Sequence, residues 1–274
     1  MAKIFPGKVV WITGGGSGIG RACAIEFAKR GADVAVSGRR LDRLEETCAA
    51  VRDHGVRALA APCDVRDEAR LEEVVGEVVG AFGRLDLAMA NAGFSAGGRI
   101  EDLTAEDWRR QFDINVVAAA MTARFSLPEL RKQKGRIVLV GSVAGFVPGP
   151  HFGAYHASKH AVRALGATLS AELFGSGVSC TTVHPGFVES EIARVDNAGQ
   201  FDDARRDKRP ASLMWTAERA ARVMVRAAEK RKRELVFTGH GKIAAFLGMH
   251  FPSLTYRFMT REKALEQASS FRVE

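Results

Sequence analysis

The sequence has few cysteines, and their spacing suits neither a cross-linked scaffold nor a metal module. Only four of the 274 residues are cysteine, and no two of them form a C-x-x-C pair: Cys23, Cys48, Cys63 and Cys180. This scatter excludes a disulfide framework and a zinc ribbon, and it is typical of a protein from a reducing, intracellular compartment.

Long hydrophobic runs are also missing. The opening residues pass from a short polar lead directly into a strand-like stretch, which leaves no room for the apolar region of a signal peptide. The longest charge-free apolar stretch near the end, residues 243–256, is interrupted by Gly248 and Pro252 and is too short to span a bilayer. We therefore expect a soluble, cytoplasmic protein.

The charge of the chain is unbalanced but not segregated. Lys and Arg number 40 against 32 Asp and Glu, a formal net charge of +8, with basic clusters at residues 205–209 and 230–233. A basic balance suits nucleic acid or an anionic membrane, but here acidic residues are interleaved with the basic ones. Since the sequence contains no zinc-finger spacing, RNP-like strand or basic zipper, we expect a solvated basic surface and no nucleic-acid partner.

Short apolar runs alternate with amphipathic, helix-like stretches along most of the chain. Runs such as residues 8–13 and 33–37 are apolar almost throughout, as in parallel strands that are covered on both faces. Glycines stand where four of the intervening helices should end: Gly31, Gly55, Gly83 and Gly175. The pattern predicts a doubly wound α/β fold, with a Rossmann-like parallel sheet and helices on both faces. We expect one domain over residues 1–239 and a C-terminal helical extension over residues 240–274.

A glycine-rich turn, TGGGSGIG at residues 13–20, lies between the first predicted strand and the first predicted helix. Glycine lets the backbone turn tightly and approach a ligand, and the following helix N-terminus offers N–H groups and a partial positive charge to a pyrophosphate. The spacing of Gly14, Gly18 and Gly20 departs from the G-x-G-x-x-G fingerprint, and glycine clusters also close ordinary turns. The position after the first strand of an alternating chain favours nucleotide binding.

The TGxxxGxG spacing resembles that of the short-chain dehydrogenase/reductase family, whose other motifs follow in order over residues 8 to about 190. These motifs are Asn91-Ala92-Gly93, Asn115 in FDINVVAA, Ser142 after the strand RIVLV, Tyr155 and Lys159 in a YxxxK element, and Pro185-Gly186. Two positions depart from the residues that are common in the family. Gly141 stands where a second serine is common, and Ser190 stands where a threonine often contacts the carboxamide of the cofactor.

The resemblance implies a catalytic set of Asn115, Ser142, Tyr155 and Lys159. Tyr155 would exchange a proton with the substrate oxygen, and Ser142 would hydrogen-bond to that oxygen. Lys159 would hold the nicotinamide ribose and tune the tyrosine, while Asn115 would position a water between Lys159 and solvent.

The residues themselves support a special role for this tyrosine. The chain has 16 Phe but only 2 Tyr, so a hydroxyl at position 155 is not generic aromatic packing. Tyr155 and Lys159 are four residues apart on a predicted helix and therefore share a face. We expect an ammonium ~4 Å from the phenol to lower its pKa from about 10.

The same resemblance implies a nicotinamide dinucleotide cofactor. The implied binding residues are Gly14, Ser17, Gly18, Ile19, Gly20, Arg39, Arg40, Asp64, Val65, Asn91, Ala92, Gly93, Tyr155, Lys159, Pro185, Gly186 and Val188. Gly38 stands where NAD-preferring relatives carry an aspartate for the ribose diol, and two arginines follow it. Because guanidinium groups offer charge-assisted donors to a 2′-phosphate, NADP(H) is predicted over NAD(H). The alternative is that both arginines are solvated residues at the start of the next helix.

Two other chemistries have less support. His156 and His160 have a helical metal-ligand spacing, but no third ligand is evident, and we expect no metal site. Ser142 lies in V-G-S-V-A rather than in G-x-S-x-G, which argues against a hydrolase triad. His184, before Pro185, is expected to be a hydrogen-bonded strand-end residue.

The sequence therefore predicts an NADP(H)-dependent oxidoreductase that interconverts a ketone and a secondary alcohol, with a fairly lipophilic substrate. The alternatives are an NAD-preferring alcohol or hydroxysteroid dehydrogenase, and a catalytically silent cofactor-binding sensor or scaffold. As in relatives, a homodimer or homotetramer would form through the helices that contain Asn115 and Tyr155. Residues 187–215 should form a polar, mobile substrate loop.

The terminal stretch from residue 242 onwards is rich in Phe, Leu and Met. We expect it to pack over the substrate cleft or at a subunit contact. The alternative is a membrane contact, with Arg257, Arg261 and Lys263 facing anionic lipid.

Overall fold

Seven parallel strands form one sheet in the computed structural model, which describes residues 4–205, 207 and 209–260. The strand order is β3-β2-β1-β4-β5-β6-β7, and every neighbouring pair is parallel. The strands are β1 (Val9–Thr13), β2 (Asp33–Gly38), β3 (Ala58–Pro62), β4 (Leu87–Ala90), β5 (Arg136–Val140), β6 (Ser179–His184) and β7 (Glu234–Val236).

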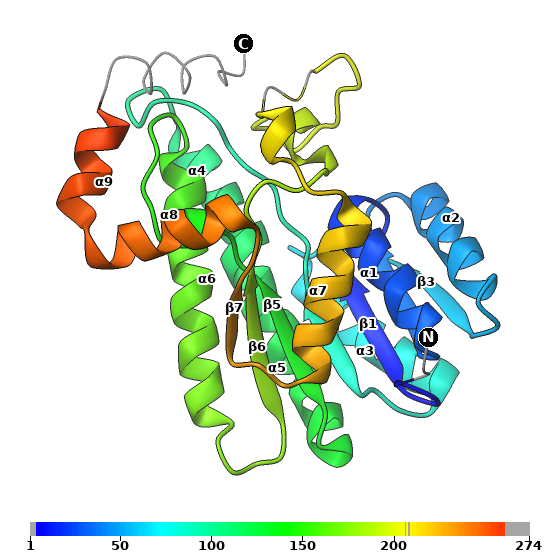
Figure 1. Ribbon diagram of the computed structural model, residues 1–274. Helices are drawn as coiled ribbons and strands as arrows, with labels where there is room; N and C mark the ends of the chain where they lie inside the picture. The colour runs from blue at the N-terminus through cyan, green and yellow to red at the C-terminus, as the bar shows by residue number, and fades with distance from the viewer. Residues whose placement is uncertain (1–3, 206, 208, 261–274) are drawn as a thin grey trace.

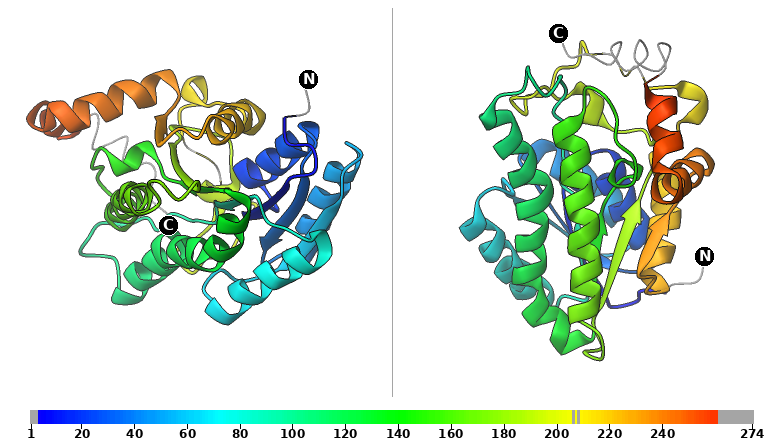
Figure 2. Two further views of the ribbon diagram at one scale, coloured as in Figure 1. Left: turned by 90° about the horizontal axis from the view of Figure 1, so that it is seen from below. Right: turned by 90° about the vertical axis from the view of Figure 1, so that its left-hand side faces the viewer.

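Helices cover both faces of the sheet (Figures 1 and 2). One layer contains α1 (Gly18–Lys29), α2 (Leu41–Arg52) and α7 (Ala217–Glu229). The other contains α3 (Glu68–Phe82), α5 (Ala118–Gln133) and α6 (Gly153–Glu172). The short helix α4 (Ala105–Phe112) leads into α5 through a π-helical turn, η1 (Asp113–Val117). The predicted doubly wound α/β fold is confirmed.

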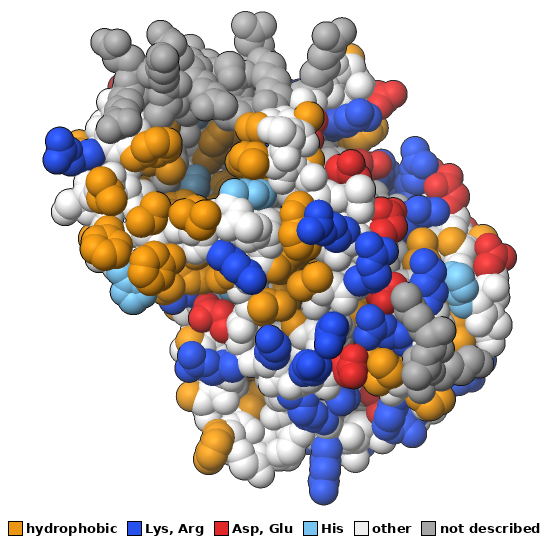
Figure 3. Space-filling view, viewed as in Figure 1, with side chains coloured by type: hydrophobic (Ala, Val, Ile, Leu, Met, Phe, Trp, Pro, Cys, Tyr) orange, Lys and Arg blue, Asp and Glu red, His pale blue; other side chains and the backbone are white. Residues whose placement is uncertain are grey.

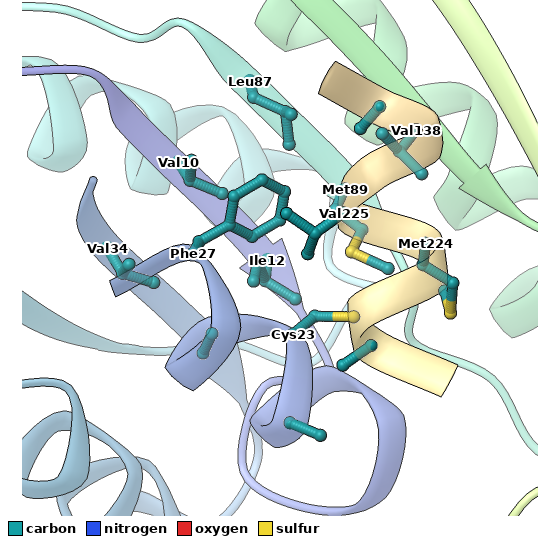
Figure 4. Close-up of a cluster of buried hydrophobic side chains, with 14 of the residues drawn as sticks. Val10, Ile12, Cys23, Phe27, Val34, Leu87, Met89, Val138, Met224 and Val225 are labelled. Atoms are coloured by element: carbon teal, nitrogen blue, oxygen red, sulfur yellow. The ribbon is translucent and has the colours of Figure 1, made fainter. Parts of the chain in front are cut away.

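Each helical layer encloses its own apolar core. Figure 4 shows Phe27 of α1 pointing between the side chains of β1 and those of α7, with Val10 and Val225 beside its ring. Phe27 is 1% exposed, and burying a side chain of this size contributes about 1.5–3 kcal/mol. Strand side chains are buried on both faces of the sheet, which explains why the strands are apolar without alternation.

The predicted helix-ending glycines lie where left-handed backbone is needed. Gly31, Gly55, Gly83 and Gly175 all have φ between 74° and 90°. Gly83 caps α3 directly, and its N–H bonds to the carbonyl of Val79. Glycine reaches this conformation without the Cβ clash that other residues meet, so these positions stop their helices.

The sheet changes its direction of growth between β1 and β4. Strands β2 and β3 extend it on one side of β1, and β4 to β7 extend it on the other. The turns after β1 and β4 are joined there, because the Thr13 hydroxyl accepts hydrogen bonds from the N–H groups of Asn91 and Ala92, each at 3.1 Å. In open parallel sheets such a switch point is where ligands bind.

Two helices follow β7, α8 (Gly239–His250) and α9 (Pro252–Met259). Helix α8 packs closely on the segment after β5, because a Cβ at Gly248 would lie 2.3 Å from the carbonyl oxygen of Phe146. Arg261 and Lys263, which the membrane alternative needs, lie outside the described residues. Among the helices that are described, none has the length and apolar character needed to cross a membrane.

Candidate active site

One groove, with a volume of about 280 Å³, collects the predicted residues at the carboxyl ends of the strands. All seventeen residues predicted to bind the dinucleotide line it, and so does Ser142. They come from the turns after β1, β2, β3, β4, β5 and β6 and from α6. The loops at the switch point thus bring together motifs from positions 14 to 188.

The glycine turn is built so that only glycine fits at its contact points. Gly14 and Gly18 have φ of 67° and 49°. A Cβ at Gly20 would lie 2.2 Å from the carbonyl oxygen of Gly14, and a Cβ at Gly14 would lie 2.9 Å from the Cα of Ala92. Helix α1 starts within this turn, so its unpaired N–H groups face the groove, as the binding of a pyrophosphate requires.

Asn91 fixes the glycine turn from the neighbouring strand. Its side-chain amide donates to the carbonyl of Thr13 at 2.9 Å and to that of Gly14 at 3.1 Å. The Thr13 hydroxyl in turn accepts a hydrogen bond from the backbone N–H of Asn91 at 3.1 Å. The sequence reasoning missed Thr13, although the threonine that opens the TGxxxGxG motif was the available signal.

Ser142, Tyr155 and Lys159 all line the groove, from the turn after β5 and from α6. Ser142 follows β5, and its hydroxyl oxygen accepts from the N–H of Ala144 at 3.1 Å. Tyr155 and Lys159 lie one turn apart on α6, with the lysine Nζ 5.7 Å from the centre of the tyrosine ring. The same Nζ donates to the carbonyl of Val140, the last residue of β5, at 3.0 Å.

The protonation of this pair departs from the expectation. In the protein alone, burial raises the pKa of Tyr155, and a hydrogen bond with Ser142 and the charge of Arg209 oppose that rise only in part. Burial also lowers the pKa of Lys159 to about 8. The expected depression of the tyrosine pKa by the lysine is therefore wrong for the protein alone, because loss of solvent is the larger effect at both groups.

Asn115 lies behind the groove rather than in its lining. It sits in the π-helical turn η1, where the Ala118 N–H bonds to the Asp113 carbonyl five residues back. Its side-chain oxygen accepts from the N–H of Phe94 at 3.0 Å, and its NH₂ group donates to the Phe94 carbonyl at 3.1 Å and to the Ser158 hydroxyl at 3.0 Å. The sequence predicted a regular helix at this point, and the π turn was missed.

Gly93 separates Asn115 from Lys159. A Cβ on this glycine would lie 3.1 Å from the Asn115 side-chain oxygen and 3.8 Å from the Lys159 Nζ. The amide and the ammonium therefore face the same small space, which a larger residue at position 93 would fill.

The two arginines after β2 line the groove, and each also contacts the segment that follows β6. Arg39 donates to the carbonyl of Gly199 at 2.9 Å. Arg40 forms an ion pair with Glu191 at 2.5 Å, and its guanidinium lies 5.3 Å from the centre of the Phe201 ring. Both arginines reach across to the segment that follows β6, but Arg39 is exposed and the Arg40 side chain is 39% exposed, as the alternative of solvated arginines at the start of α2 predicts.

Asp64 is held beside the groove by its own loop. Its carboxylate accepts from the Arg66 guanidinium at 2.7 Å, and these hydrogen bonds lower the pKa of Asp64 despite its partial burial. Val65 lines the groove next to it.

The described residues between positions 187 and 215 border the groove as short turns, with η3 at Glu191–Arg194 and η4 at Ala211–Leu213. The Asn197 side chain exchanges two hydrogen bonds with the backbone of Gly97, both at 2.9 Å. Arg110 donates to the Asn197 carbonyl at 2.9 Å. Sequence reasoning missed these contacts, because each joins residues about 90 or more positions apart without a motif.

His184 explains the glycine at position 141. Its ring is fully buried and contacts the Glu234 carboxylate at 3.0 Å and the carbonyl of Ser142 at 3.3 Å. A Cβ at Gly141 would lie 2.4 Å from its Nδ1, so a second serine does not fit beside this ring. Burial lowers the pKa of His184 to about 4.

His156 and His160 do not converge on a common point. The Nδ1 of His156 contacts the carbonyl of Ala144, and that of His160 contacts the carbonyl of His156. No group of three His, Cys, Asp or Glu side chains within the described part of the chain is placed to hold a metal ion.

Comparisons with known proteins agree with this geometry. The family model described as short chain dehydrogenase matches residues 8–200. The chain is 37% identical over 236 residues to 11-beta-hydroxysteroid dehydrogenase A of Sesamum indicum, a match that covers 83% of this chain and 67% of that protein.

Two solved structures extend the comparison. A short chain dehydrogenase/reductase from Burkholderia phymatum in complex with NAD has a TM-score of 0.81 at 29% identity, over 94% of this chain and 97% of that one. An alcohol dehydrogenase from the archaeon Thermococcus sibiricus, complexed with 5-hydroxy-NADP, has a TM-score of 0.73 at 26% identity, over 84% and 95%. The family model covers more than half of the chain, and the protein therefore belongs to the short-chain dehydrogenase/reductase family, as an oxidoreductase that acts on CH–OH groups with a nicotinamide dinucleotide.

Proposed function

We propose that this enzyme interconverts a ketone and a secondary alcohol with NADP(H), with Tyr155 as the general acid and base. The observation that carries the proposal is that Ser142, Tyr155 and Lys159 line the same groove as the glycine turn. A carbonyl bound there would lie next to both a proton donor and the reactive end of a dinucleotide seated on α1.

The groove suits a dinucleotide by its shape and its donors. The glycine turn leaves a cradle that a Cβ would fill, and the N-terminus of α1 supports a pyrophosphate. The nicotinamide supplies the hydride when it is bound. Pro185, Gly186 and Val188 would hold it from the side of β6, and Lys159 would bind its ribose.

Tyr155 would give its proton to the oxygen of the reduced substrate. Its raised pKa keeps the phenol protonated at neutral pH, which is the state that donation needs. Ser142 would donate to the same oxygen, and this hydrogen bond strengthens as negative charge develops there. We propose that Asn115 and Lys159, which face each other across Gly93, hold a water that returns the proton from solvent.

The preference for NADP(H) is the second part of the proposal. Arg39 and Arg40 lie where the adenosine ribose would bind, and Gly38 contributes no carboxylate to repel a 2′-phosphate. A specific observation favours the alternative cofactor, since both arginines already have partners in the segment after β6. The ratio of kcat/KM for NADPH and NADH decides between the two.

The substrate is proposed to be fairly lipophilic, in line with the relative named as a hydroxysteroid dehydrogenase. The test is a panel of ketones ordered by increasing lipophilicity, with loss of NADPH fluorescence as the signal. Turnover that improves along the series supports the proposal. Binding of NADPH with no oxidation by any ketone would instead favour a silent sensor or scaffold.

We propose that the protein works as a homodimer or homotetramer through the helical segments that contain Asn115 and Tyr155. A separate surface, on α8 and α9, is apolar, and Figure 3 shows hydrophobic side chains gathered over both helices. Its exposed members are Ile243, Phe246, Met249, Phe251, Leu254, Tyr256 and Phe258. We propose that this α8–α9 surface is a subunit contact, with membrane contact as the alternative.

A further inference from the structure

The arginine pair after β2 joins two parts of the molecule that a short-chain dehydrogenase uses for different purposes. Arg39 and Arg40 line the groove from the turn after β2, where the adenosine ribose is proposed to bind, while their partners Glu191, Gly199 and Phe201 belong to the segment that was expected to form the substrate loop. The chain distance from Arg40 to Glu191 is 151 residues, so this contact exists only in the folded protein.

Glu191 forms an ion pair with the Arg40 guanidinium, the group that a 2′-phosphate would also contact. Its carboxylate lies 2.5 Å from the Arg40 NH2 and itself lines the groove. The guanidinium is further constrained by the Phe201 ring at 5.3 Å. A phosphate that approached Arg40 would therefore have to share its donors with this carboxylate and would be repelled by the same negative charge.

The other arginines that line the groove also have hydrogen-bond or ion-pair partners. The Arg39 guanidinium donates one hydrogen bond to the carbonyl of Gly199. Arg43 is paired with Glu46 at 3.1 Å on its own helix. Arg209 is paired with Asp207 at 2.6 Å and also reaches toward Ser190. The net charge offered to a 2′-phosphate is thus set by which acidic groups stand beside these guanidiniums.

We propose that Glu191 is a cofactor-selectivity residue, whose carboxylate competes with a 2′-phosphate for Arg40 and so restrains the preference for NADP(H). The inference rests on the proposed function, since it assumes that the groove binds a nicotinamide dinucleotide with its adenosine ribose next to Arg40. It adds that the selectivity is set from the substrate side of the groove as well as from the turn after β2.

The test compares Glu191→Gln with the native protein by titration calorimetry, with NADP⁺ and NAD⁺ as ligands. Loss of the carboxylate should tighten NADP⁺ by about fivefold while changing NAD⁺ by less than about twofold, the modest range expected for a part-exposed ion pair. Adenosine 2′,5′-bisphosphate and 5′-AMP provide the same comparison without the nicotinamide. The gain should shrink as salt is raised.

Glu189→Gln is the matched control, because Glu189 lies on the same segment but lines the neighbouring cavity beside α1. It should leave both affinities unchanged. Glu191→Ser is a second variant without the charge, and it should show the same gain as Glu191→Gln. Circular dichroism and the melting temperature verify that each variant is folded.

A double-mutant cycle tests the route through Arg40. In an Arg40→Gln background the effect of Glu191→Gln on NADP⁺ should fall to near unity. An equal gain in both backgrounds, or an unchanged NADP⁺ to NAD⁺ ratio in the single variant, overturns the inference while the proposed function stands. Failure of the native protein to bind either dinucleotide overturns both.

Discussion

Tyr155 is the residue on which the proposed chemistry depends most. Replacement with phenylalanine removes the proton donor but keeps the ring and its contact with the Lys159 ammonium. We expect Tyr155→Phe to lower kcat by at least about a thousandfold, near the upper part of the range for a general acid, and to leave the dissociation constant of NADPH within about twofold. Stopped-flow oxidation of NADPH and fluorescence titration measure the two quantities. Turnover close to the native rate would remove Tyr155 from its role.

Gly141 gives a prediction about packing behind Ser142. A Cβ at this position would lie 2.4 Å from the Nδ1 of His184, whose side chain is fully buried and held by hydrogen bonds. Gly141→Ala should therefore lower the free energy of unfolding by roughly 1–3 kcal/mol, as overpacking does, and it should reduce kcat by shifting the neighbouring Ser142.

Gly76→Ala in α3 is the control, because nothing lies within 4 Å of the added Cβ. A gain of about 0.5–1 kcal/mol is expected there, since alanine favours a helix interior over glycine. Urea denaturation compares the two variants. Equal effects at positions 76 and 141 would show that the His184 ring does not constrain Gly141.

Residues that belong to motifs were expected to lie together in the fold, and they do. The seventeen predicted binding residues line one groove, because glycine turns and strand-end motifs have local causes that can be read in the sequence. The contacts of Glu191 and Asn197 were not predicted, because their partners, Arg40 and Gly97, are far away in the sequence. No local pattern reports a contact that only the tertiary fold creates.

At the scale of elements, Asp86 joins the amino ends of β1 and β4. This carboxylate is 2% exposed and accepts from Arg84 at 2.7 Å, from the N–H of Val9 at 3.0 Å and from Lys8 at 3.0 Å. Burial alone would raise its pKa, but these hydrogen bonds outweigh burial and hold the pKa of Asp86 below its ordinary value. The ionised form is therefore the one that the fold stabilises.

Because the pKa of Asp86 is lowered in the folded protein, the stability of the protein should depend on pH. A depressed pKa in the folded state stabilises the protein above the unfolded pKa of about 3.9, and the contribution is lost as the pH falls through the folded value. Asp86→Asn should lower the free energy of unfolding by about 1–2 kcal/mol at pH 7. The difference in that free energy between the variant and the native protein should become smaller below about pH 4. Chemical denaturation at both pH values measures it, and a difference that stays constant with pH would contradict the assignment.

Elements with a continuous pattern were predictable, and the exception has a physical reason. The stretch predicted as the second strand, residues 33–37, is observed as Asp33–Gly38, because buried parallel strands are apolar throughout. The π turn at Asp113–Val117 was not predicted, because no sequence pattern marks its extra residue, and the Asn115 side chain within it bonds to the distant residues Phe94 and Ser158. Such turns are common at functional positions.

Within the part of the chain that the structure describes, the α8–α9 surface gathers seven exposed apolar side chains along two successive helices. The sequence predicted an apolar extension but not which side chains would be exposed, since α8 is apolar nearly all round. Leu254 and Phe258 on α9 are 55% and 59% exposed. Exposed patches of this kind mark contact surfaces more often than isolated side chains do.

A double variant, Leu254→Ser with Phe258→Ser, tests whether this surface joins subunits. We expect it to lower the oligomeric state or to weaken the assembly by about tenfold or more in dissociation constant, measured by light scattering after size exclusion. Ile4→Ser is the control, because Ile4 is 44% exposed and lies before β1, on neither of the proposed contact surfaces. An unchanged assembly, together with loss of co-sedimentation with phosphatidylserine vesicles, would assign the surface to a membrane instead.

The π turn that carries Asn115 has a consequence for the alignment of the helix on either side. A turn closed by an i to i+5 bond holds one residue more than an α turn, and each residue of an α-helix advances the direction of its side chain by about 100°. The buried and exposed faces of α4 are therefore rotated by that angle relative to those of α5. Deleting one residue between positions 113 and 117 would remove this rotation and turn the Asn115 side-chain amide away from Phe94. No substitution at position 115 can produce the same displacement.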